Sequence, residues 1–256
     1  MKIIKKLFYG VAYLSLFSKL LAFNIGIAPT GFYTSLDKNE THEIMVTNNT
    51  MEPMRVEISV EKDEGWEKYD MGEMMKIYPK NLTLKPNGSR SVRFAVRGAK
   101  DLPEGEYKTK LIFRELPGKP KDDSKEVKGE TGQEVAVEFE LLTEIHVAAY
   151  GLKGQRKIGA QLTGSEIKKD TNGNKKLVAN FDLRGNSGLA VVGDIEYLDG
   201  GKKRLLKEEV KLGITTREPK TKIESDLVNI PKGSKYIRVN FKDKSGLKLG
   251  SRELPL

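Results

Sequence analysis

Short β-rich runs alternate with turn residues from Asn24 onward, and this pattern limits the fold more than any other feature of the sequence. The clearest run is MRVEISVEK (54–62), in which Val56, Ile58 and Val60 share one face and polar residues share the other. Strand side chains point alternately to opposite faces, so such runs bury one face of an antiparallel sheet. The pattern predicts an all-β sandwich or barrel, with a turn or two of helix only in EGWEKYDMGEMM (64–75).

The β pattern is interrupted twice, and the interruptions suggest how the chain is divided. Residues 118–133 (GKPKDDSKEVKGETGQ) are mostly charged with Gly and Pro, which predicts a loop between two strands. Tyr150 to Gly154 then resembles a domain junction, after which hairpin turns such as Asn172-Gly173 and Asp199-Gly200-Gly201 separate a second set of runs. We predict two domains of similar size, 24–150 and 151–256, each long enough to bury a core.

The first 23 residues are expected to form a secretory signal peptide. Three lysines precede the apolar run LFYGVAYLSLF (7–17), which is too short to span a bilayer comfortably. Cleavage is expected after Ala22 or Phe23; the alternative is an uncleaved anchor. Export would place the protein in the periplasm, and loss of the four lysines in residues 1–22 would lower the net charge from +9 to +5. That basic excess favours acidic partners or an anionic envelope surface.

The residue types point away from catalysis, metals and nucleic acid. There is no cysteine, so disulfides, thiolate metal sites and a cysteine nucleophile are excluded. The two histidines, His42 and His146, lie on separate predicted strands, and no G-x-S-x-G, Walker or H-E-x-x-H motif occurs. Lysines are interleaved with acids instead of forming a basic block, as on an ordinary solvated surface. We therefore predict a protein that is not an enzyme and that has no cofactor, metal or nucleic-acid partner.

The longest alternating run in the chain is QEVAVEFELLTEIHVAAY (133–150). Val135, Val137, Phe139 and Leu141 point to one side of the predicted strand. Leaving these four side chains in water would forgo on the order of 6–12 kcal/mol, so they must face something. They either fill the core of their own sandwich or meet a strand added from a partner. The residues alone leave both alternatives open.

The stretch LTLKPNGSRSVRFAVRGAKDLPEGEYKTKLIFRELP (82–117) resembles periplasmic pilus chaperones of the PapD type. A turn before a Val-Arg-hydrophobic strand, an L-P segment and a terminal E-hydrophobic-P occur in the family's order. The matching residues are Pro86, Ser89, Arg90, Val92, Arg93, Leu102, Pro103, Glu115, Leu116 and Pro117. VTNNT (46–50) and the alternating run after the charged loop also match in place. The resemblance covers about residues 24–150 and implies two tandem immunoglobulin-like β-sandwich domains.

This resemblance implies a mechanism and a set of binding residues. Family members lend a strand to an incomplete, pilin-like subunit, so Val137, Phe139 and Leu141, with Val135 as a fourth, would be the donor residues here. The family holds the subunit's terminal carboxylate with two cations, whose positions fall on Tyr33 and His146 in an ungapped alignment. Neither is a permanent cation, and the GEYKTKLIF text also departs from the family pattern, which suggests a divergent branch.

The resulting functional prediction is a periplasmic chaperone for subunits of a pilus, or fimbria, or of another surface fibre, binding by strand donation. An outer-membrane usher would be a further partner. Because an open apolar edge tends to associate, two copies could also cap each other as a homodimer. The alternative is a structural or adhesive module of the cell envelope that shares the architecture and lacks chaperone activity.

Overall fold

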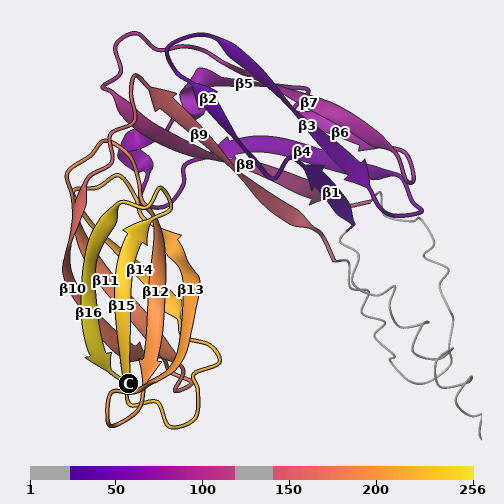
Figure 1. Ribbon diagram of the computed structural model, residues 1–256. Coiled ribbons are helices and arrows are strands. Elements are labelled where there is room, and N and C mark those ends of the chain that lie inside the picture. The colour runs from indigo at the N-terminus through magenta and orange to yellow at the C-terminus, as the bar shows by residue number, and fades with distance from the viewer. Residues whose placement is uncertain (1–23, 119–140) are drawn as a thin grey trace, which may run out of the picture.

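The structure is a computed structural model that describes residues 24–118 and 141–256, and these residues form two β-sandwiches (Figure 1). The predicted signal peptide 1–23 and nearly all of the predicted charged loop lie outside the described residues. Two 3-10 turns, η2 (Glu67–Tyr69) and η3 (Gly72–Met74), fall where a little helix was expected. No helix in the described ranges is long and apolar enough to cross a membrane. The all-β prediction is confirmed.

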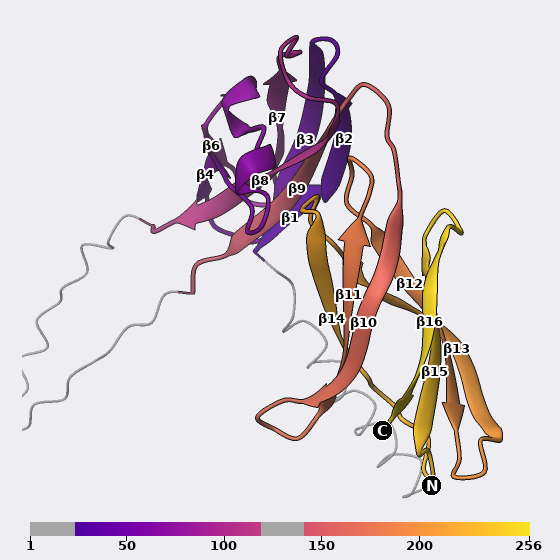
Figure 2. The same cartoon turned by 90° about the vertical axis from the view of Figure 1, so that its left-hand side faces the viewer.

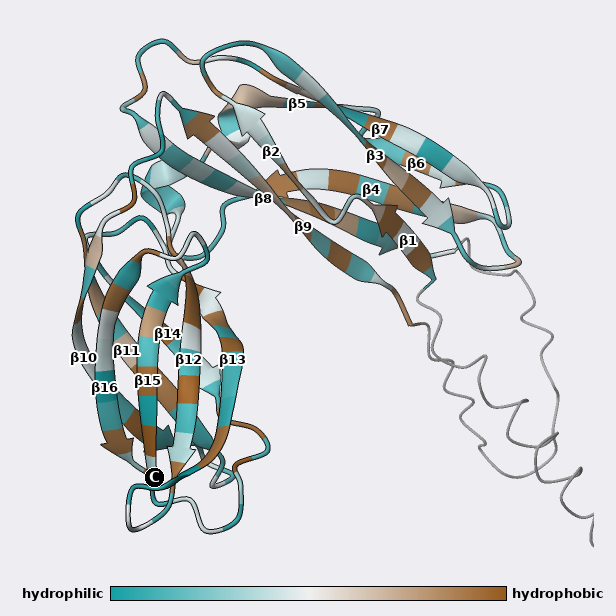
Figure 3. Ribbon diagram, in the orientation of Figure 1, coloured by the Kyte–Doolittle hydropathy of each residue, from teal (hydrophilic) through white to brown (hydrophobic). Residues whose placement is uncertain are grey.

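The first sandwich packs a four-stranded sheet against a five-stranded sheet. The four-stranded sheet has the order β1 (Ile25–Ala28), β3 (Glu40–Asn48), β7 (Ser89–Val96) and β5 (Met75–Tyr78). The five-stranded sheet has the order β2 (Gly31–Ser35), β9 (Glu144–Lys153), β8 (Gly105–Leu116), β4 (Met54–Glu61) and β6 (Asn81–Leu84). Hydrophobic and hydrophilic segments alternate along these strands in Figure 3, and the inward set forms one core that includes Phe94, Leu111 and Phe113.

Two segments that look continuous in the sequence each divide between the two sheets. β1 lies in the four-stranded sheet and β2 in the other, with Pro29 between them. Likewise β5 and β6 lie in different sheets, with Pro79 between them. Proline has no N–H to donate to a ladder, so each proline marks the place where pairing with one sheet ends. These crossings join the two sheets covalently at both sides of the sandwich.

The second sandwich has a three-stranded and a four-stranded sheet. The first has the order β10 (Ala160–Lys169), β11 (Lys175–Leu183) and β14 (Lys220–Asp226). The second has the order β13 (Arg204–Ile214), β12 (Ala190–Leu198), β15 (Tyr236–Asp243) and β16 (Lys248–Pro255). β10 also lies beside β16, so the two sheets meet along one side (Figure 2). A separate core, with Phe181 and Phe241 in edge contact, fills this domain.

The two sandwiches meet at the start of β8 and form a bent molecule (Figure 1). Glu106 N–H donates to the Asn186 carbonyl over 2.8 Å, and Gly188 N–H donates to the Glu106 carboxylate over 2.9 Å. Arg217 donates to the carbonyls of Glu104 (2.5 Å) and Glu106 (3.3 Å). The first strand residue, Gly105, has φ 134°, and a side chain there would collide with the Asn186 carbonyl and with Arg217. The contact is therefore close and polar.

The proposed division at residues 150 and 151 falls within β9, which continues to Lys153. Residues 154–159 then lead to β10. Within this connection the Gly154 N–H donates to Asp37 over 3.0 Å, and Arg156 donates to the Gly188 carbonyl over 3.1 Å. The linking segment is thus bonded to both domains.

Candidate functional site

The apolar side of β9 continues past the end of its own domain. Ile145, Val147 and Ala149 face the core, and Val147 is fully buried. The backbone ladder between β8 and β9 ends with the bond from Glu115 N–H to the Thr143 carbonyl, 2.9 Å long. Leu141 lies beyond this last bond and is 86% exposed. Counted back from Ile145 by twos, Leu141 has the parity of the core-facing residues, but it is not one of the residues that pack in the core of this domain.

Leu141 is the one predicted donor residue that the structure describes. Val135, Val137 and Phe139 lie outside the described residues, so their role as donor residues stays a prediction. Leu142, of the opposite parity, is 40% exposed. Both leucines at the described start of this segment therefore offer apolar surface to solvent.

The first half of β9 also has a free side. β8 pairs with β9 along its whole length, from Glu144 to Lys153. On the other side, β2 pairs in parallel only from Ala148 to Leu152. Within the described part of the chain, residues 144–147 thus have a strand neighbour on one side only. An unpaired strand edge is a template for addition of another strand.

A hollow of about 450 Å³ lies next to Leu141, at the end of the first domain that is away from the second. Its lining includes Asn24, Pro53, Met54, Glu115, Pro117 and Leu141. Glu115 is held in place because its carboxylate accepts a 3.0 Å hydrogen bond from the Thr143 N–H. The hollow therefore has an ordered rim at the place where the β8–β9 ladder stops.

The two predicted anchor residues do not come together. Tyr33 is opposite Tyr150 in the β2–β9 register and stacks on it, with ring centres 5.0 Å apart. His146 lies four residues earlier on β9, or about 13 Å along the strand. Its Nε2 is 2.7 Å from the Glu144 carboxylate, and this bond together with Arg114 lowers the pKa of Glu144. Because the Tyr33 side chain carries no positive charge, these two positions do not form a pair of cations.

A cation does lie beside the Tyr33–Tyr150 stack, and it comes from β8. Lys108 is opposite Tyr150, with its Nζ 5.2 Å from that ring and 5.8 Å from the ring of Trp66. The same Nζ forms a 2.5 Å ion pair with Asp63. Burial alone would lower the pKa of Lys108, but its bonds and attraction to Asp63 outweigh this, and the pKa is raised. Lys108 is thus permanently charged but already paired.

The next outward residue on β8, Lys110, is half-buried opposite Ala148 and forms no ion pair within the described ranges. The sequence pattern did not single out Lys108 or Lys110 as site residues. The signal was present in GEYKTKLIF, where two lysines alternate with core residues and so must share the outer face. What the sequence could not give is the pairing of β8 with β9, which brings these lysines beside the candidate strand.

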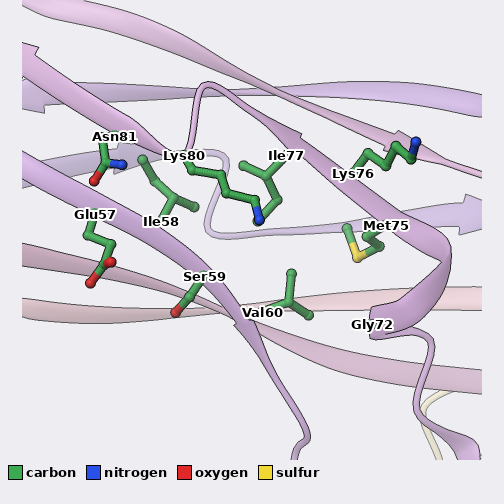
Figure 4. A pocket seen from close by; sticks show the side chains of 10 residues that line it. All are labelled: Glu57, Ile58, Ser59, Val60, Gly72, Met75, Lys76, Ile77, Lys80 and Asn81. Atoms are coloured by element: carbon green, nitrogen blue, oxygen red, sulfur yellow. The ribbon is translucent and has the colours of Figure 1, made fainter.

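A second hollow, of about 660 Å³, opens between β4 and β5 (Figure 4). Ile58, Val60, Met75 and Ile77 line its floor, and Figure 4 shows the Lys80 side chain extended beside Ile77. Its single carboxylate belongs to Glu57. In the described residues no group of three potential metal ligands occurs, either here or elsewhere. This hollow is the space between the edges of the two sheets, and its described lining offers no group of catalytic or metal-binding residues.

Comparison with known proteins gives a match by structure. The chain matches no family model and no curated protein. The crystal structure of the YadV chaperone covers 91% of this chain and 100% of its own, at 10% identity and a TM-score of 0.51. This chain has the same two-domain fold. The predicted tandem sandwiches, and the resemblance in fold to chaperones of the PapD type, are therefore confirmed.

Complexes are also among the similar structures. The Salmonella enterica SafA pilin in complex with the SafB chaperone matches at 14% identity, 92% and 97% coverage and a TM-score of 0.48. A chaperone–tip adhesin complex of CFA/I fimbriae matches at 12% identity, 91% and 98% coverage and a TM-score of 0.48.

Proposed function

We propose that the protein is a periplasmic chaperone that binds and stabilises pilus or other surface-fibre subunits by donating a strand. The donated strand would be the segment that leads into β9, with Val135, Val137, Phe139 and Leu141 as its apolar residues. The observation that carries the proposal is the exposure of Leu141, 86%, on the core-facing parity of β9. A strand that filled only its own sandwich would have no apolar residue left over at this point.

The free side of residues 144–147 supports the same proposal. Backbone groups there can hydrogen-bond to an added strand, while the apolar residues before it set the register. Burial of each large apolar side chain is worth roughly 1.5–3 kcal/mol, so four donors would contribute on the order of 6–12 kcal/mol to the complex. Lys110, half-buried opposite Ala148, would be the cation that meets a terminal carboxylate, in place of Tyr33 and His146.

Further parts of the proposal concern location and partners. The chain would be exported by residues 1–23, would deliver its subunit to an outer-membrane usher, and would catalyse no reaction. Without a subunit, the free edge of β9 would let two copies cap each other. Sedimentation of the purified chain over a range of concentrations should then show a dimer.

A photo-crosslinking residue in place of Leu141, introduced in the native host, tests the proposal directly. The expected adduct is a secreted subunit whose own sandwich lacks one strand, identified by mass spectrometry. The same residue in place of Thr171, exposed in the β10–β11 turn, is the control and should give no such adduct. Identical products from both positions, or no protein adduct from Leu141, would favour an envelope module without chaperone activity.

The substitution Leu141→Glu should abolish subunit capture and leave the fold intact. A charged residue in the donor series would be buried unpaired in the complex, at a cost of several kcal/mol, but it stays in water in the free protein. The free energy of unfolding should therefore change by no more than about 0.5 kcal/mol. Leu142→Glu, of the opposite parity, is the matched control and should keep capture. If Leu141→Glu unfolds the first domain, Leu141 belongs to its own core and strand donation is wrong.

A further inference from the structure

The end of the second domain that faces away from the first is formed by two hairpin turns and one connection between the two sheets (Figure 1). They join β10 to β11, β12 to β13 and β14 to β15, and we call residues 168–176, 199–207 and 226–236 the distal tip. Backbone bonds hold the loops together. Leu227 N–H donates to the Lys175 carbonyl over 2.9 Å, and Lys235 N–H donates to the Leu198 carbonyl over 2.8 Å.

Positive charge is concentrated on the distal tip. It carries ten basic residues and three acids, whereas the whole chain has a net charge of +9. The basic residues are Lys168, Lys169, Lys175, Lys176, Lys202, Lys203, Arg204, Lys207, Lys232 and Lys235. The tip therefore accounts for most of the basic excess of the chain. In the sequence this is hidden, because the three segments are far apart and each also contains an acid.

The acids of the distal tip are occupied within the loops. The Asp170 carboxylate accepts hydrogen bonds from the backbone N–H groups of Asn172 and Asn174, both 2.8 Å long. The Asp199 carboxylate accepts in the same way from Gly201 and Lys203, over 2.9 Å each. These aspartates shape their turns. They do not form ion pairs with the neighbouring lysines.

Most lysines of the distal tip have no acidic partner. Lys168, Lys176, Lys202 and Arg204 form ion pairs with Glu166, Asp226, Glu253 and Glu196, respectively. The other six form none within the described residues, and these are Lys169, Lys175, Lys203, Lys207, Lys232 and Lys235. On the outer face of the nearby four-stranded sheet, by contrast, Lys242 contacts both Asp194 and Glu209. Six cations without an acidic partner among the described residues are thus gathered on the tip.

Apolar side chains stand exposed among these lysines. Val228 is 66% exposed, Leu205 is 42% exposed and Leu206 is 39% exposed. Each lies within a few residues of a tip lysine in the sequence. Unpaired lysines around exposed aliphatic side chains suit a lipid interface, where ammonium groups meet phosphates and short apolar groups enter the headgroup region.

We infer that the distal tip docks on the surface of an anionic lipid bilayer. Nine of the ten basic residues are lysines, which act as point charges without the planar fork that arginine uses to recognise one particular carboxylate or phosphate. The hollow in this region, of about 510 Å³, is lined by Asp170 and Asp226 as well as Lys176, so it is not a basic groove that would hold one acidic peptide. A surface that offers many phosphates at once, without one fixed geometry, complements the tip best. This inference is independent of strand donation.

Co-sedimentation of the full chain with lipid vesicles tests the docking. Vesicles of equal parts phosphatidylcholine and phosphatidylglycerol should bind the protein, and pure phosphatidylcholine vesicles should bind it much less. Binding should weaken strongly when salt is raised from about 0.1 M to 1 M, because the screening length falls from about 10 Å to 3 Å.

The decisive variant replaces Lys203, Lys207, Lys232 and Lys235 by glutamine. One lysine near an anionic surface contributes on the order of fivefold to partitioning, so loss of four should lower it by on the order of several hundredfold. The control replaces four exposed lysines of the first domain, Lys62, Lys76, Lys85 and Lys100, by glutamine, with the same change in net charge. It should retain most of the binding. All three proteins have the same N-terminus, so their difference isolates the tip.

The further outcomes are equally definite. Val228→Ser should reduce binding to anionic vesicles a few-fold, and the reduction should persist at high salt, because it removes an apolar contact. An equal loss in both four-lysine variants would mean that only net charge matters, and the docking would be wrong. Retention on immobilised polyglutamate without binding to anionic vesicles would overturn it in favour of an acidic protein partner.

Discussion

The two ends of the ladder between β8 and β9 differ in what surrounds them. At one end, Glu104 and Glu106 at the start of β8 are hydrogen-bonded to Asn186, Gly188 and Arg217 of the second domain. At the other end, among the described residues, 144–147 of β9 have a strand neighbour on one side only, and the exposed Leu141 follows the core-facing parity. The second domain thus holds the β8–β9 pair at the Gly105–Lys153 end, which we call the locked end. The Arg114–Glu144 end, which we call the open end, stays accessible. The exposure of Leu141 is informative because β9, the strand that follows it, is paired with β8 along its whole length.

At the open end the strand edge of β9 is unpaired, but the core beneath it is well packed. Phe113→Ala tests whether the core there is packed. Phe113 is fully buried one residue from the end of the β8–β9 register, in edge contact with Phe94 at 6.3 Å. Its truncation should lower the free energy of unfolding of the first domain by about 3–5 kcal/mol, measured by denaturant titration. Leu141→Ala, at the same end, should change it by less than about 0.5 kcal/mol. Similar values for the two would show that the open end is not packed.

The locked end depends on Arg217. Besides its two backbone bonds, the guanidinium lies 4.4 Å from the ring centre of Tyr69 and 5.2 Å from that of Tyr107. Arg217→Ala should cost about 2–3 kcal/mol and loosen the junction, seen as faster hydrogen exchange at Gly105 and Glu106. Arg217→Lys should recover only part of this, because lysine lacks the planar fork. Unchanged exchange in the alanine variant would mean that the other contacts hold the junction alone.

Glu106, at the locked end, should make the protein less stable as the pH rises through its pKa. Burial raises the pKa of Glu106 above 4.5, although the nearby Arg156 and the Gly188 N–H oppose this. The folded state then binds a proton that the unfolded state has released, so stability should fall as the pH rises from about 4.5 through the folded-state pKa. Melting curves of Glu106→Gln should lack this fall. A fall of the same size in the variant would assign it to another group.

Glu40 should have the opposite effect on stability, at a lower pH. The Ser35 N–H, together with Lys38 and Thr34, lowers its pKa from 4.5 to about 2. Its contribution to stability is therefore present above about pH 4.5 and is lost as the pH falls toward 2. Melting curves of Glu40→Gln below pH 4.5 should lack that loss. The two titrations are thus separable in one acid series.

The strand pattern predicted the fold because sandwich strands here obey period two closely. MRVEISVEK buries Val56 and Ile58 as the sequence indicates. The division of NIGIAPTGFYTSL between two sheets was not predicted, because local alternation does not identify a strand's neighbours. The parallel pairing of β2 with β9 is likewise a long-range property. Tyr33 and His146, the anchor positions that the ungapped alignment gave, lie four residues apart in this register.

For the candidate site, the sequence predicted which side chains of one strand share a face, but not which other strands lie beside it. The parity of Leu141 follows from the sequence, but its exposure depends on where the β8 ladder ends, which no local pattern gives. Trp66 shows the same limit. It is buried against Gly188 of the other domain, although the sequence around it resembles a polar turn. Contacts between domains are set by three-dimensional placement and leave little local signal.

The antiparallel register between β8 and β9, from Gly105 opposite Lys153 to Arg114 opposite Glu144, has a mechanical consequence. The hydrogen bonds of such a ladder lie perpendicular to the strands. Tension applied along β9 at its Glu144 end would therefore load all the rungs together in shear, and would not peel them apart one by one. Because β9 continues through residues 154–159 to β10, and the start of β8 is also bonded to the second domain, the load would pass to both sandwiches. A chain built this way can be pulled hard at its exposed end without unravelling.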